Sequence, residues 1–87
     1  MNRDEFRLLV GKRPLLFDGA MGTMLHTKGV AVDQCFDAIN LYNPAVVADI
    51  HRGYIDAGAD VIETNSFGAN RYKLGEYGLH YDVVEIN

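Results

Sequence analysis

The sequence PLLFDGAMGT, residues 14–23, places a continuous apolar run directly before an acidic, glycine-rich turn. The run itself contains no polar residue, so a strand formed there would be apolar on both faces. Such strands are typical of parallel sheets that helices cover on both sides. Asp18 and Gly19 end the run, as expected where a buried strand enters a tight turn. We therefore predict a buried strand over residues 14–17.

A second stretch, DVIET at residues 60–64, indicates another strand. A strong helical signal precedes it. Asn43 can cap a helix that begins at Pro44, and apolar side chains then recur at helical spacing. Gly58 is a natural end for that helix.

The other expected elements alternate with these strands. Helices are predicted over residues 4–10, 23–28 and 70–77 and from residue 82 onward, with loops over residues 30–42 and 65–68. Strands that alternate with helices predict an α/β fold built on a parallel sheet. Two strands alone would leave unpaired apolar edges, so further strands are expected beside them.

Composition excludes several classes of protein. The chain has 87 residues and a net charge of −4, and its 8 Lys and Arg residues form no basic stripe, which argues against nucleic acid and anionic membrane as partners. The single cysteine, Cys35, permits no disulfide within the chain. No signal peptide or membrane-spanning run is recognisable, so we expect a cytoplasmic protein.

The first candidate site is the turn at the end of the first predicted strand. Ligands of α/β proteins bind where strands end, and the Asp18 carboxylate could hold an ammonium group. Gly19 and Gly22 allow close approach of a ligand, and backbone N–H groups there could bind a carboxylate. The alternative is that Asp18 caps the following helix and the glycines only form the turn.

The second candidate site follows the second predicted strand. Thr64, Asn65 and Ser66 carry short hydrogen-bonding side chains and would lie at the same edge as Asp18. The alternative is that Asn65 and Ser66 satisfy the backbone of their own loop.

Three segments in order resemble the homocysteine S-methyltransferase family, whose homocysteine-binding module also occurs in cobalamin-dependent methionine synthase. They are FDGAMGTML (residues 17–25), CFDAINLYNP (residues 35–44) and YIDAGADVIETNSFGA (residues 54–69). The resemblance implies that residues 1–87 are the N-terminal part of a homocysteine-binding (β/α)8 TIM barrel: its first two βα units, incomplete without the rest. It implies a methyltransferase of methionine biosynthesis that transfers a methyl group to the zinc-activated thiol of homocysteine.

The resemblance also implies which residues bind substrate and which cofactors take part. The substrate-binding positions that it implies are Asp18, Gly19, Ala20, Gly22, Asn65 and Ser66. Zinc in the complete enzyme is held by three cysteines of later strands, and Cys35 matches none of them. The methyl source is cobalamin or methyltetrahydrofolate, with S-methylmethionine and betaine also open. This chain is expected to hold no metal and to be inactive by itself, and it needs the remainder of the barrel for stability.

Two other functions remain open from the residues alone. The chain could be a small, non-catalytic α/β module that binds an amino acid or another anion at the Asp18 turn. It could also be a half-barrel that assembles with a partner chain through its unpaired strand edges.

Overall fold

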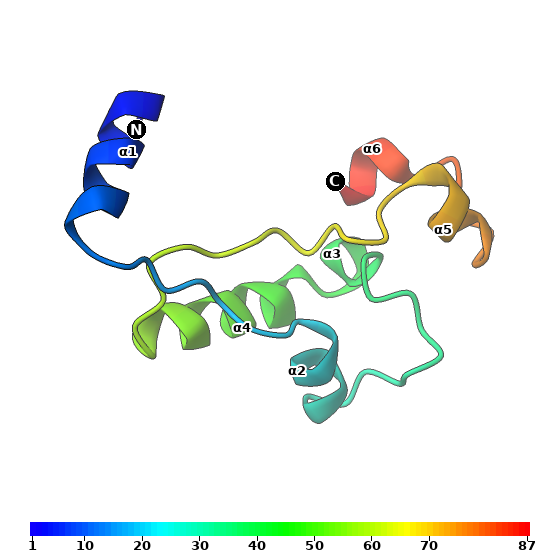
Figure 1. Ribbon diagram of the computed structural model, residues 1–87. Helices are drawn as coiled ribbons and strands as arrows, with labels where there is room; N and C mark the ends of the chain where they lie inside the picture. The colour runs from blue at the N-terminus through cyan, green and yellow to red at the C-terminus, as the bar shows by residue number, and fades with distance from the viewer.

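Helices and connecting segments make up the structure, a computed structural model that describes residues 1–87 (Figure 1). Six helices follow one another along the chain: α1 (Arg3–Lys12), α2 (Gly22–Thr27), α3 (Ile39–Tyr42), α4 (Pro44–Asp56), α5 (Arg71–Gly75) and α6 (Val83–Ile86). None of these helices is long and apolar enough to span a membrane.

The predicted helices are confirmed, and side chains of neighbouring residues cap the starts of α1, α4 and α5. The Asn2 side chain accepts a hydrogen bond from Glu5 N, and Asn2 N donates in return to the Glu5 carboxylate, a capping box that starts α1. Asn43 and Asn70 cap α4 and α5 through their side-chain oxygens. Gly58 lies just beyond α4 with φ of 110°, a conformation that favours glycine.

The predicted loop over residues 30–42 is wrong at its end. Residues 39–42 form the short helix α3, which leads directly into the cap of α4. Its signal is weak in sequence because four residues are too few to establish a helical period. α3 instead forms where Ile39 is buried against α2 and α4.

The predicted fold class is also wrong. The chain contains no strand and no sheet, and a single isolated parallel bridge joins Phe17 to Val61. The structure therefore does not contain the first two βα units of a (β/α)8 barrel. Residues 14–17 and 60–64 are extended segments that run side by side, not strands (Figure 1).

Side chains close the pairing of these two segments at both ends. Within the pair, the N–H of Val61 donates to Leu16 O and the N–H of Asp18 donates to Val61 O, at 3.2 and 3.0 Å. At one end the Asp60 carboxylate accepts from Leu16 N at 3.0 Å, and at the other the Asp18 carboxylate accepts from Glu63 N at 2.9 Å. Aspartate side chains thus take the positions that backbone carbonyls would occupy in a longer ladder, and no third segment pairs with either outer edge.

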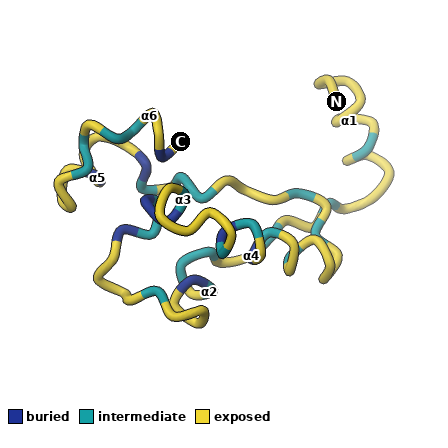
Figure 2. The backbone as a smooth tube through the Cα atoms, turned by 180° about the vertical axis from the view of Figure 1, so that it is seen from behind, coloured by how far each residue is buried: buried dark blue, intermediate teal, exposed yellow.

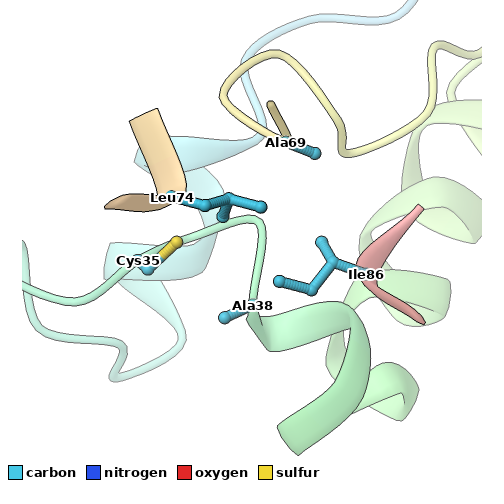
Figure 3. Close-up of a cluster of buried hydrophobic side chains, with 5 residues drawn as sticks. All are labelled: Cys35, Ala38, Ala69, Leu74 and Ile86. Carbon is cyan, nitrogen blue, oxygen red and sulfur yellow. The ribbon is translucent and has the colours of Figure 1, made fainter. Parts of the chain in front are cut away.

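The interior consists of two small apolar clusters and not one core. Only 9 of the 87 residues are buried. One cluster lies between α2, α3 and α4: Leu25, Ile39, Val47 and Ile50. The other joins the segment before α3 to α5 and α6, and Figure 3 shows its side chains converging: Cys35, Ala38, Ala69, Leu74 and Ile86.

The outline is correspondingly extended. The Cα radius of gyration is 15.1 Å, against about 12 Å for a compact domain of this length. α1 buries no residue and projects from one end, and Figure 2 shows that most of its surface, like that of the extended segments, is exposed.

Candidate functional site

A polar hollow lies where the two extended segments end. It has a volume of about 160 Å³. Its lining comes from the turn after the first segment and from the loop after the second: Asp18, Gly19, Met21, Glu63, Thr64, Asn65, Ser66 and Phe67. The two stretches that sequence reasoning selected therefore meet at one place, although they are more than 40 positions apart in the chain.

Asp18 uses one carboxylate oxygen to join the two stretches. Its Oδ2 accepts the 2.9 Å hydrogen bond from Glu63 N, while its Oδ1 has no hydrogen-bond partner in the chain. The side chain does not cap α2, whose N-cap residue is Met21 and which has no side-chain cap. Asp18 is half-buried, so the free oxygen stays available to a cationic group.

The turn after Asp18 is held by packing against α4 and the chain before α3. Tyr54 of α4 donates its hydroxyl to Ala20 O at 2.7 Å. A Cβ atom at Gly19 would lie 3.0 Å from that hydroxyl oxygen, and one at Gly22 would lie 3.1 Å from the Phe36 ring. A side chain at either position would therefore require the facing aromatic ring to shift. Ala20 and Gly22 flank the hollow without lining it.

Backbone donors of both stretches are free. The N–H groups of Gly19, Ala20 and Met21 donate to no acceptor in the chain, and neither do those of Thr64 and Asn65. Unpaired backbone N–H groups readily bind an anionic oxygen. The hollow thus combines free N–H donors with a free carboxylate oxygen.

Asn65 and Ser66 make hydrogen bonds within the protein. The Asn65 amide nitrogen donates to Phe36 O at 2.9 Å and to Asn40 Oδ1 at 3.0 Å. The hydroxyls of Ser66 and Thr64 share a 2.6 Å hydrogen bond. Both side chains therefore stabilise the loop, while the Asn65 amide oxygen accepts no hydrogen bond within the chain.

Sequence reasoning included Thr64 in the second candidate site but did not name Met21, Glu63 or Phe67 as binding residues. All four line the hollow beside the selected residues, and adjacency in sequence is the signal that would have found the three unnamed ones. Asn40 supports the loop from α3. Nothing in its sequence context marks Asn40, because its partners lie 25 and 46 positions away.

Charges at the hollow are acidic. Asp18 and Glu63 both line it, and neither is in a salt bridge. The nearest ion pair closes the opposite end of the extended segments, where Arg13 binds Asp60 at 2.9 Å. The hydrogen bonds that the Asp60 carboxylate accepts from Arg13 and from Leu16 N lower the pKa of Asp60. An acidic hollow with free N–H donors suits a ligand that carries both an ammonium and a carboxylate group.

The residues of this chain do not fit a zinc site. No three His, Cys, Asp or Glu side chains lie close enough together to hold a metal ion. Cys35 is buried among the apolar side chains of the cluster that joins the segment before α3 to α5 and α6.

Comparison with known proteins identifies the family. Residues 15–87 match the model of the homocysteine S-methyltransferase family. Methionine synthase from Mycobacterium tuberculosis is 39% identical across 91% of this chain, and methionine synthase from Mycobacterium leprae is 40% identical across 90% of it. The chain spans about 7% of the length of either relative. With a family match that covers most of its residues, the chain belongs to the homocysteine S-methyltransferase family.

Proposed function

We propose that this chain is part of an enzyme that transfers a methyl group to the thiol of homocysteine and so forms methionine. Within it, the turn at residues 18–22 and the loop at residues 63–66 bind the amino acid portion of homocysteine. The observation that supports this role is the single hollow in which a free Asp18 oxygen lies beside free backbone N–H groups. Family membership and the similarity to two methionine synthases support the substrate and the reaction.

Each polar group of the amino acid has a counterpart in the hollow. The ammonium group is assigned to Asp18 Oδ1, with Glu63 adding negative charge beside it. The carboxylate is assigned to the free N–H groups of Gly19 and Met21, which line the hollow, and to that of Ala20 between them on the same turn. The thiol would then extend away from both groups.

Activation of sulfur is not assigned to these residues. Methyl transfer requires the thiolate, and a free thiol has a pKa of about 8.5. No metal-ligating cluster lies near the hollow, and Asp18 and Glu63 would disfavour a nearby negative charge. The role proposed for this chain is therefore substrate binding and orientation.

The charge of Asp18 is the direct test. In Asp18→Asn the amide oxygen can still accept from Glu63 N, so the turn keeps its geometry while the charge is lost. We expect the dissociation constant for homocysteine to rise about fivefold, the equivalent of a solvent-accessible ion pair of ~1 kcal/mol. Titration calorimetry with homocysteine on the full-length gene product measures this dissociation constant.

Asp33→Asn is the matched control. Asp33 is exposed and makes no hydrogen bond or ion pair, so the same change of charge there should leave homocysteine affinity unaltered. Equal affinity in the Asp18 and Asp33 variants would contradict the proposed role of Asp18. Binding of homocysteine without formation of methionine from any methyl donor would instead favour the non-catalytic binding module.

A further inference from the structure

Asn40 connects three parts of the chain that are distant in sequence. Its side-chain nitrogen donates to Asn65 O at 2.8 Å and to Ile86 O at 3.0 Å. Its side-chain oxygen accepts from the Asn65 amide nitrogen at 3.0 Å. α3, the loop of the proposed site and the end of α6 are therefore held by one amide group.

The hydrogen-bonding capacity of the Asn40 side chain is well matched to this place. Both of its N–H groups have a carbonyl acceptor, and its oxygen has an amide donor. The group is also partly buried, so water competes weakly for these bonds. The orientation of the amide is fixed by its partners, because two carbonyl oxygens can face only the nitrogen.

Asn65 is held from both sides as a result. Its backbone carbonyl and its side-chain nitrogen both bind Asn40, and the same nitrogen also reaches Phe36 O. Asn65 follows Thr64 directly, and these two residues carry the free N–H groups on this side of the hollow. The direction in which the loop presents those groups thus depends on Asn40.

We propose that Asn40 is a positioning residue for ligand binding at the hollow. Without touching the ligand, it fixes the loop at residues 64–66 so that the loop faces the Asp18 turn in one arrangement. This inference rests on the proposed function, because homocysteine is the ligand by which it is measured.

The test is Asn40→Asp, which preserves size and shape but removes both N–H donors. The carboxylate would face two carbonyl oxygens, so the loop should shift. We expect homocysteine to bind the full-length gene product about tenfold more weakly, the scale of one lost hydrogen bond. Asn40→Ala removes the same donors without adding charge, and it carries the test if the aspartate variant does not fold, as judged by circular dichroism.

Asn70→Ala separates positioning from stability. Asn70 caps α5 through a hydrogen bond from Lys73 N and does not line the hollow. Its removal should lower the melting temperature while leaving homocysteine affinity unchanged at a temperature where the protein is folded. A purely structural role for Asn40 would give that same result for the Asn40 variants.

The outcomes distinguish this inference from the proposed function. Weaker binding by folded Asn40 variants, with normal binding by Asn70→Ala, supports the positioning role. If wild type and the folded Asn40 variants bind homocysteine with equal affinity, the inference is overturned and the proposed function still stands. Failure of wild type to bind homocysteine overturns both.

Discussion

Phe67 and Leu74 are large apolar residues seven positions apart with opposite surroundings. Phe67 is fully exposed, at 102% of its reference area, whereas Leu74 is 0% exposed. Truncating each to alanine therefore tests whether the interior consists of the small clusters described above. Truncation of a phenylalanine that packs in a core would lower the free energy of unfolding by about 3–5 kcal/mol.

The magnitudes follow from those two exposures. Phe67→Ala removes no buried area in this chain, so the free energy of unfolding should change by less than about 0.5 kcal/mol. Leu74→Ala empties the middle of a cluster of five buried residues. Leu79 and Val83 are only partly buried against that cluster and can close over part of the space. We therefore expect the free energy of unfolding to fall by about 2–3 kcal/mol, near the lower end of the range for truncation of a buried leucine.

Urea denaturation of both variants, followed by the helical circular dichroism signal, measures the difference. The two variants should separate clearly in midpoint, with Leu74→Ala unfolding at the lower urea concentration. A loss for Phe67→Ala equal to that for Leu74→Ala would refute the reasoning, since it would require Phe67 to be packed. Sedimentation should accompany the measurement, because Phe67 buried between two copies would also produce a loss.

Two further predictions concern the ends of the extended segments. Gly19→Ala should lower stability by about 1 kcal/mol, because its Cβ would lie 3.0 Å from the Tyr54 hydroxyl and displace the hydrogen bond that holds the turn. Gly11→Ala, where a Cβ meets nothing within 4 Å, is the control and should be neutral or stabilising in the same denaturation assay. Hydrogen bonds from Arg13 lower the pKa of Asp60 in the folded chain. The stability that ionised Asp60 contributes is therefore present above its unfolded pKa of about 3.9, and it is lost as the pH falls through the lower pKa of the folded state. Asp60→Asn should flatten the acid side of a plot of stability against pH, and an unchanged slope would argue against this pairing.

Part of the site could be predicted from the sequence. Asp18 and Asn65 each follow a predicted strand, and reasoning from strand ends placed them at one edge. The structure brings both to the same hollow even though the runs form no sheet. Apolar runs indicate that two segments are extended, whereas a sheet also requires partners for both outer edges.

The bonds that shape the site could not be predicted. The acceptor of Tyr54 is 34 positions away, and the acceptors of Asn40 are 25 and 46 positions away. No local pattern specifies such partners, because a side-chain amide or hydroxyl forms equally good bonds with any carbonyl that the fold brings near.

The sequence by itself determined where α1, α4 and α5 begin and where α4 ends. Asn2, Asn43 and Asn70 each bond to a backbone N–H only three residues ahead, and Gly58 ends α4 through its own φ angle. Such signals act within one helical turn and need no tertiary contact. Only the tertiary structure decided that the apolar runs would pair at one bridge and that Asn40 would hold the loop of the site. Those outcomes depend on contacts between distant segments, and the free energy of such contacts exists only once the segments are together.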